Sequence, residues 1–163
     1  MSETLYPIAV EVNGRARTGQ VPARTSLVDW LRDELRLTGT HVGCEHGICG
    51  ACSIMLDGEP VRSCLMYAVQ ADGHRITTVE GLTKPDGSLS ALQDSFCETH
   101  AMQCGYCTSG MLIAAQALLD HNPRPSEDEI RDAIGGNLCR CTGYQQIVDA
   151  VQLAARRIAE GAK

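Results

Sequence analysis

The chain has 163 residues, of which 44% are hydrophobic and 4% aromatic, and its 14 Lys and Arg against 20 Asp and Glu give a formal net charge of −6 at pH 7. This length suits one medium-sized domain or two small ones. Because an acidic balance disfavours general binding to nucleic acid or to anionic membranes, we expect neither among the partners.

Cysteine usage and the N-terminus indicate the compartment. Nine cysteines are unusual for this length, and an odd count fits a disulfide scaffold poorly, so ligation of a metal or cluster in a reducing compartment is favoured. Residues 1–7 show no secretory or twin-arginine signal. The longest apolar run, residues 111–119, is too short to cross a bilayer and is interrupted by Gln116. We therefore expect a cytoplasmic protein.

The N-terminal half begins with a predicted hairpin and a helix. Residues 6–12 indicate a strand, and Asn13-Gly14 is the strongest short hairpin signal, so a second strand should return over residues 15–20. Ser26 can then cap a helix that runs to about Leu35, with apolar residues at helical spacing.

The next stretch, residues 41–52, carries the strongest signal in the chain. Cysteines follow a C-x4-C-x2-C spacing with glycines before and between them, and a further cysteine follows in the next hairpin. Thiolates on a glycine-rich loop and its neighbour are what a plant-type [2Fe–2S] cluster needs. Glycine also lets backbone N–H groups approach the cluster sulfurs. The predicted ligands of this first cluster are Cys44, Cys49, Cys52 and Cys64.

A second hairpin and a late strand complete this half. Residues 53–56 and 60–62 flank the Asp57-Gly58 turn, and residues 75–79 are rich in β-branched side chains. Two hairpins, one helix and a late strand are typical of a small α+β unit with the layout of a β-grasp, plant-type ferredoxin-like domain. We place this [2Fe–2S] domain at residues 1–81.

After about Gly81, helices replace strands. Lys84 to Gly87 have turn chemistry, and no convincing strand follows. Apolar spacing predicts four helices, of which the second is apolar nearly all round and the third starts with a capping box: residues 89–96, 111–119, 126–134 and 144–158. We expect an all-α four-helix bundle domain over residues 82–163.

A second set of cysteines is divided across the predicted bundle. Cys104 and Cys107 stand just before the apolar helix, and Cys139 and Cys141 stand between the third and fourth helices. Pairing C-x2-C with a distant C-x-C provides the ligands of a second site at the ends of two helices. The dipole of the apolar helix should also stabilise the thiolates of Cys104 and Cys107.

These motifs, taken in order, resemble those of the small iron–sulfur subunit of molybdenum hydroxylases in the xanthine dehydrogenase family. Three stretches carry the resemblance: residues 43–52, 103–108 and 136–144. It extends over nearly the whole chain. One departure is Ser109, where the family commonly has Pro after Cys-Thr; Ser109 should loosen the first turn of that helix slightly and removes no ligand.

The resemblance implies an electron-transfer subunit of a multi-subunit oxidoreductase, with two [2Fe–2S] clusters and no catalytic residue of its own. It implies a large subunit with molybdopterin, in the cytosine dinucleotide form, and a medium subunit with FAD, in a heterotrimer or a dimer of heterotrimers. Electrons would pass from the molybdopterin centre through the second cluster and then the first to FAD, during hydroxylation with oxygen derived from water. Gln103 and Cys141 would lie against the pterin. The form Cys44-Glu45-His46-Gly47 resembles that of N-heteroaromatic hydroxylases in the family.

The two cysteine sets also have other interpretations. Either cysteine set alone also suits structural zinc, although the x4 spacing and glycine loop weigh against it for the first set. A Rieske site using His46 and His100 would leave Cys49, Cys52 and Cys64 without a role, and a dithiol pair at Cys104 and Cys107 would do the same to Cys139 and Cys141. The alternative function is a free-standing ferredoxin-like carrier or a metal-stabilised binding module.

A few residues near the motifs remain without a ligand role. Cys97 reads as a small buried hydrophobe rather than a ligand. His41 and His46 read as exposed loop histidines, with tuning of the first cluster as the other possibility. Arg140 either offsets the charge of an anionic cluster or pairs with a partner's phosphate or carboxylate.

Overall fold

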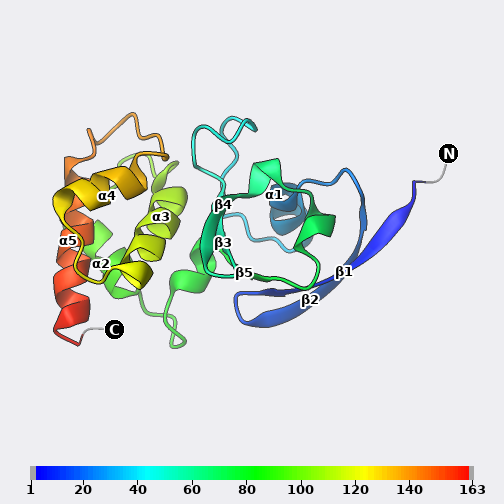
Figure 1. Cartoon of the computed structure of the whole chain (residues 1–163), viewed down its shortest axis with the longest axis horizontal. Helices are drawn as coiled ribbons and strands as arrows, with labels where there is room; N and C mark the ends of the chain where they lie inside the picture. Colours follow the sequence, from blue (N-terminus) through cyan, green and yellow to red (C-terminus); the bar gives the residue numbers. More distant parts are fainter. Residues whose placement is uncertain (1–2, 162–163) are drawn as a thin grey trace.

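A five-stranded mixed sheet forms the N-terminal part of the computed structural model, which describes residues 3–161 (Figure 1). The strand order is β2-β1-β5-β3-β4, in which β1 and β5 are parallel and the other neighbours antiparallel. The strands are β1 (Leu5–Val12), β2 (Arg15–Pro22), β3 (Ser53–Leu56), β4 (Glu59–Arg62) and β5 (Arg75–Thr77). Both predicted hairpins are therefore confirmed. The last strand is shorter than predicted, because a 3-10 turn, η4 (Val79–Leu82), follows it.

The predicted helix after Ser26 forms, but it changes pitch. The hydroxyl of Ser26 accepts a hydrogen bond from the Asp29 N–H and begins α1 (Leu27–Asp29), which continues as a π-helical segment, η1 (Trp30–Glu34). The Leu35 N–H donates to the Trp30 carbonyl, five residues back, which produces the wider turn. An unbroken α-helix to Leu35 was thus the wrong expectation for its second half.

The sheet and this helix enclose the first hydrophobic core. Alternate residues of β1, including Val10 and Val12, face Leu27, Trp30 and Leu31, and all are almost fully buried. Each large apolar side chain buried in this way stabilises the fold by about 1.5–3 kcal/mol. Short 3-10 turns, η2 (Ser63–Leu65) and η3 (Ala68–Ala71), cover the same core between β4 and β5.

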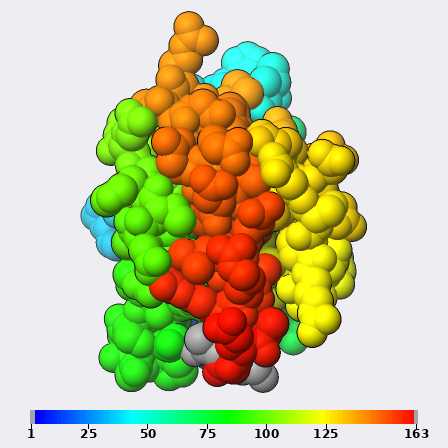
Figure 2. All heavy atoms as spheres, turned by 90° about the vertical axis from the view of Figure 1, so that its left-hand side faces the viewer, coloured from blue at the N-terminus to red at the C-terminus, as the bar shows by residue number. Residues whose placement is uncertain are grey.

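The described residues after η4 contain helices and no strand, as the sequence predicts. They are α2 (Ala91–Glu98), α3 (Thr108–His121), α4 (Glu127–Ile134) and α5 (Gln145–Ala159). The predicted capping box of α4 is present, since Ser126 and Glu129 exchange hydrogen bonds. Leu89 lies outside α2 and is exposed. Figure 2 shows α5 running between α2 and α4, against which it packs.

The two parts of the chain pack directly on each other through α3. Ile54 of β3 faces the first core, while the next residue, Met55, packs on Ile113 and Ala117 of α3. Because β3 is buried on both faces, its Ser53-Ile54-Met55-Leu56 run is not the alternating pattern of a half-exposed strand. Residues 1–2 and 162–163, the outer ends of the two predicted domains, lie outside the described residues.

None of the helices within residues 3–161 is both long and apolar enough to cross a bilayer. The apolar helix α3 is instead largely enclosed by its neighbours, and most of its residues are buried in the cores of the fold.

Gly110 marks the closest approach between α3 and the first cysteine loop. A Cβ atom there would lie 2.1 Å from the Gly50 carbonyl oxygen and 2.7 Å from the Asn137 side-chain nitrogen. We predict that Gly110→Ala lowers the free energy of unfolding by about 1–3 kcal/mol through overpacking. By helix propensity alone, replacing glycine with alanine would stabilise α3 by about 1 kcal/mol, so the predicted loss must come from the close contacts. Chemical denaturation checks this prediction, and a variant as stable as the parent or more stable would contradict it.

Candidate metal centres

The first four predicted ligands come from the loop before β3 and from η2. Cys44 and Cys49 lie in the loop, Cys52 lies just before β3, and Cys64 lies in η2 after the second hairpin. Their side chains form two contacts: Cys44 with Cys49, and Cys52 with Cys64. The hairpin therefore does the positioning, since it returns the chain from Cys52 to Cys64 in antiparallel register.

Backbone amides surround the first of these sulfurs. The N–H groups of His46 and Cys49 both lie 3.4 Å from the Cys44 Sγ. Donation from Cys49, and then from His46, lowers the pKa of the Cys44 thiol to about 6. Burial and the neighbouring Cys52 raise the pKa of the Cys64 thiol to about 11. The first set thus contains one cysteine, Cys44, whose thiolate is stabilised by N–H donors, and one half-buried cysteine, Cys64, whose thiol form is favoured.

The second four predicted ligands also converge as pairs. The Sγ atoms of Cys104 and Cys141 lie 3.5 Å apart, and the Cys107 side chain contacts that of Cys139. Cys107 stands at the N-terminus of α3, and Cys139 lies in the loop between α4 and α5. Residues 104 and 141 are exposed, whereas 107 and 139 are half-buried. One pair therefore faces out of this chain and the other faces inward.

The thiol acidities of this set depend on local contacts. The backbone N–H of Tyr106 and the Cys141 thiol donate to Cys104 and lower its pKa. Burial raises the pKa of Cys107 to about 12, aided by the neighbouring Cys139. The net pKa shifts of the two residues are therefore opposite, and the contribution of the helix dipole to the Cys104 and Cys107 thiolates stays a prediction. For Cys139, burial is outweighed by hydrogen bonds from Thr142, and its pKa is lowered.

The grouping of the sulfurs fits a binuclear cluster in each set. Within residues 3–161, no three His, Cys, Asp or Glu side chains gather around one point as they would around a single ion. Two separate pairs of thiols per set are what two bridged irons require, because each iron takes two cysteine ligands. The pairing of the thiols within each set therefore fits a [2Fe–2S] cluster.

The two cysteine loops touch each other at the side chain of Asn137, which is 1% exposed. Its Nδ2 donates to the Gly50 carbonyl at 3.1 Å, and its Oδ1 accepts from Arg62 at 3.3 Å. The Leu138 N–H donates to the Cys49 carbonyl at 2.9 Å. Because Leu138 precedes Cys139, this bond joins a predicted ligand residue of one set to the neighbour of a predicted ligand in the other.

A second contact joins the loops on the α3 side. The rings of His41 and Tyr106 stack with centroids 4.9 Å apart, and the Tyr106 hydroxyl donates to the Val42 carbonyl. His41 is therefore half-buried, not an exposed loop residue as expected, whereas His46 is exposed. Ser109 is buried, and its hydroxyl lies 3.5 Å from the Ala51 carbonyl, so it contacts the first loop as well as opening α3.

The other residues singled out in the sequence, Gln103, Arg140 and Cys97, are all exposed. The Gln103 side chain donates to the Cys141 carbonyl at 3.2 Å, and both residues are exposed at the end of the molecule that carries the second set. Arg140 is exposed between its two cysteines. Cys97 is exposed on α2, so the expectation of a buried hydrophobe was wrong. Glu98, beside it, pairs with Arg157 of α5.

Sequence reasoning missed three residues that hold the loops. Arg62 of β4 donates to the Gly136 carbonyl at 2.7 Å. The Tyr144 hydroxyl accepts from the Cys139 N–H at 2.9 Å and donates to the Asn137 carbonyl at 3.1 Å. Asn137 itself lies in a stretch where the sequence suggests only close backbone approach. The available signal for Asn137 was a polar residue in a glycine-rich stretch near a predicted ligand. No sequence signal indicated the role of Arg62.

Two families of iron–sulfur domains match successive parts of the chain. Residues 10–83 match the family described as "2Fe-2S iron-sulfur cluster binding domain". Residues 78–152 match the family described as "[2Fe-2S] binding domain". Each match contains one complete set of the cysteines discussed above.

Individual relatives match over nearly their full length. The caffeine dehydrogenase subunit gamma of Pseudomonas sp. (strain CBB1) is 59% identical, over 90% of this chain and 89% of the relative. The nicotine 6-hydroxylase small subunit of Paenarthrobacter nicotinovorans is 58% identical, over 88% and 86%. Among solved structures, a chain of quinoline 2-oxidoreductase from Pseudomonas putida 86 superposes with a TM-score of 0.93 at 50% identity, covering 99% of this chain and 100% of that one.

Cys104 and Cys97 offer a matched pair for testing ligation, because both are exposed. We predict that Cys104→Ser loses about two of about four iron atoms per chain, since one cluster loses a terminal ligand. Cys97→Ser should keep its full iron content. Iron and sulfide analysis of the purified proteins checks both, and loss of iron in the Cys97 variant alone would contradict the assignment.

The contact at Asn137 generates a further prediction. Asn137→Ala leaves the Gly50 carbonyl and the Arg62 guanidinium without their amide partner, and should lower the free energy of unfolding by about 1–3 kcal/mol. It should also alter the EPR lines of both reduced clusters, since Gly50 belongs to one loop and Asn137 to the other. Asn122→Ala, at the C-cap of α3, is the control, because the Asn122 side chain hydrogen-bonds to Glu129 and to the Arg124 N–H rather than to a cysteine loop. Unchanged EPR spectra for Asn137→Ala would contradict a shared contact.

Proposed function

The chain belongs to the small iron–sulfur subunits of xanthine dehydrogenase-family molybdenum hydroxylases, and we propose that it relays electrons from molybdopterin on a large subunit to FAD on a medium subunit. The observation that carries this proposal is the contact between two complete cysteine sets through the Leu138–Cys49 hydrogen bond. A chain with one set would serve as a simple carrier, whereas two sets in contact suit transfer in series.

The eight paired cysteines would hold one [2Fe–2S] cluster in each set, with Cys44, Cys49, Cys52 and Cys64 in the first and Cys104, Cys107, Cys139 and Cys141 in the second. When bound, such clusters supply one-electron redox chemistry at potentials set by charge, hydrogen bonds and exposure. The N–H groups directed at Cys44 and the Thr142 hydroxyl, 3.2 Å from the Cys139 Sγ, orient those sulfurs.

The exposure of the two sets supports the proposed order of transfer. Gln103, Cys104 and Cys141 are exposed together, which suits an entry point where the pterin would meet the Gln103 amide and the Cys141 sulfur. The rim of the first loop carries exposed apolar side chains, Ile48 at 68% and Leu65 at 60%. Such side chains suit docking of a second polypeptide, and we assign this rim to the FAD subunit.

We further propose the assembly and its setting. The chain would act as two domains, a ferredoxin-like unit at residues 1–81 and a four-helix bundle at residues 82–163. It would join the molybdopterin (cytosine dinucleotide) and FAD subunits in a heterotrimer or a dimer of heterotrimers. A cytoplasmic location is supported by the odd number of cysteines and their cluster-like spacing, which suit a reducing compartment. An N-heteroaromatic substrate is supported by relatives named for caffeine, nicotine and quinoline.

The relay is tested on the native complex. We expect the chain to co-purify with molybdenum- and flavin-containing partners, and substrate addition under anaerobic conditions to reduce the second cluster before the first in freeze-quench EPR. Cys139→Ser should stop electron flow to the final acceptor while substrate still binds to the large subunit. Recovery of the native chain as a monomer would favour a free-standing carrier, and full electron flow in the Cys139 variant would contradict the order of the clusters.

A further inference from the structure

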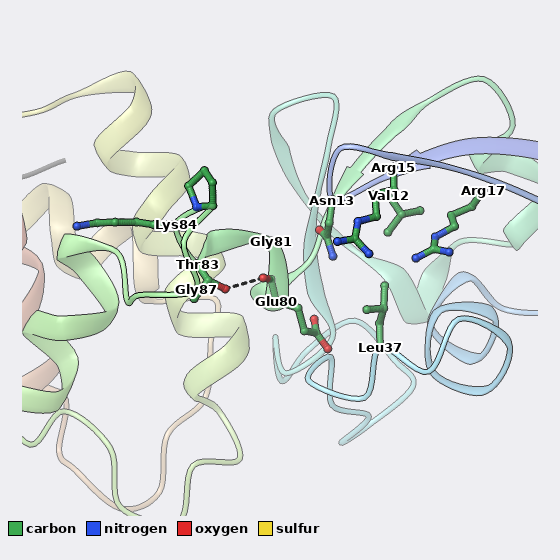
Figure 3. Close-up of a pocket in the computed structure, with 11 residues that line it drawn as sticks. Val12, Asn13, Arg15, Arg17, Leu37, Glu80, Gly81, Thr83, Lys84 and Gly87 are labelled. Atoms are coloured by element: carbon green, nitrogen blue, oxygen red, sulfur yellow. Dashed lines mark hydrogen bonds between the residues drawn. The ribbon is translucent and has the colours of Figure 1, made fainter.

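A pocket of about 680 Å³ lies away from both cysteine sets, where the β1–β2 hairpin meets η4 and the turn at residues 83–87 (Figure 3). Val12 and Leu37 give it an apolar wall. The side chains of Arg15 and Arg17 reach from β2 toward the same space beside Leu37 (Figure 3). A hollow that joins apolar surface to two guanidinium groups is a candidate binding site.

The two arginines occupy an unusual place on the sheet. Arg15 pairs in register with Val12, and Arg17 with Val10. Residues directly opposite each other share one face of an antiparallel pair, and the two valines face the first core. The arginines therefore lie on the core-facing side of β2, which is an edge strand of the sheet. Because side chains alternate between the two faces of a strand, apolar residues are expected at these positions.

These arginines lack anionic partners in the described part of the chain. Within residues 3–161, the Nε of Arg17 is buried without a hydrogen-bond acceptor, and neither arginine takes part in an ion pair. Glu80, the carboxylate that lines the pocket, accepts from the Gly39 N–H at 2.8 Å and from the Thr78 hydroxyl at 2.6 Å. A buried guanidinium N–H without a partner is destabilising. The described residues around the pocket supply no acceptor to the Arg17 Nε, so an acceptor from another molecule would stabilise it.

We propose that this pocket receives an acidic polypeptide segment of a partner subunit, whose carboxylates pair with Arg15 and Arg17. The guanidinium fork matches a carboxylate in bidentate geometry. Two residues along a strand span about 7 Å, which is also the spacing of alternate side chains in an extended segment. The open edge of β2 offers backbone groups to such a segment. A single inorganic anion would fill only a small part of the cavity.

The charge of the whole chain makes this pocket the exception on an otherwise acidic protein. With a formal net charge of −6, the chain repels acidic polypeptides in general, so two unpaired arginines provide a local exception. The inference rests on the proposed function, because the occupant is a subunit of the same complex. It adds a contact that involves neither cysteine set.

Affinity measurements on the iron-loaded chain test this proposal. The chain is titrated against the remaining subunits of the complex at about 50 mM and about 500 mM NaCl. The variants are Arg15→Gln, which changes an exposed residue alone, the double variant Arg15→Gln/Arg17→Gln, and the control Arg24→Gln, whose side chain pairs with Glu3. We expect the double variant to bind roughly tenfold or more weakly at low salt, with a smaller difference at high salt, and Arg15→Gln to lie between it and the control.

Iron content and the absorption spectrum should match the parent in every variant, which separates binding from folding. Equal affinity and equal salt dependence for the parent, Arg15→Gln and the double variant would overturn the inference while leaving the relay intact. Binding of inorganic phosphate to the chain alone, lost in the double variant without a change in subunit affinity, would overturn it in favour of a small anion. If the parent chain binds no partner subunit, the proposed function falls, and the inference with it.

Discussion

The buried amide of Asn137 is the contact on which the arrangement of the two halves depends. It donates to the Gly50 carbonyl in one cysteine loop, accepts from Arg62 of β4, and stands two residues before Cys139 in the other loop. A buried polar group of this kind is stabilising only while all its partners stay in place, so it fixes one relative placement of the loops. The Leu138–Cys49 hydrogen bond then forms as a consequence of that placement.

The surrounding packing keeps this contact dry and close. Gly50 has a positive φ of 76°, and a Cβ there would lie 2.6 Å from the Asn137 Cγ, so a side chain has no room. Gly110 removes the same obstacle on α3. Met55 and Ile113 pack the sheet against α3 behind the loops. Apolar packing thus sets the distance between the halves, and hydrogen bonds set the register between the loops.

The strands and most of the helices were predictable because they have local signals, such as the Asn13-Gly14 turn or the Ser126–Glu129 capping box. The pitch change after Asp29 has no local signal in the sequence; the structure shows it in the hydrogen bond from the Leu35 N–H to the Trp30 carbonyl. The acidities of the thiols could not be predicted from the sequence, because they depend on burial and on neighbouring thiols, which raise the pKa of Cys107. Arg62 lies far from residues 136 and 137 along the chain, so only the fold reveals that they meet.

The most direct test of the account is the magnetic interaction between the two reduced clusters, measured by EPR at more than one microwave frequency. If both cysteine sets hold [2Fe–2S] clusters on loops joined by Asn137 and Leu138, the fully reduced protein should show two signals with a field-independent splitting caused by their mutual coupling. A single signal, or two signals without any coupling, would contradict the claim that this chain holds two clusters in series.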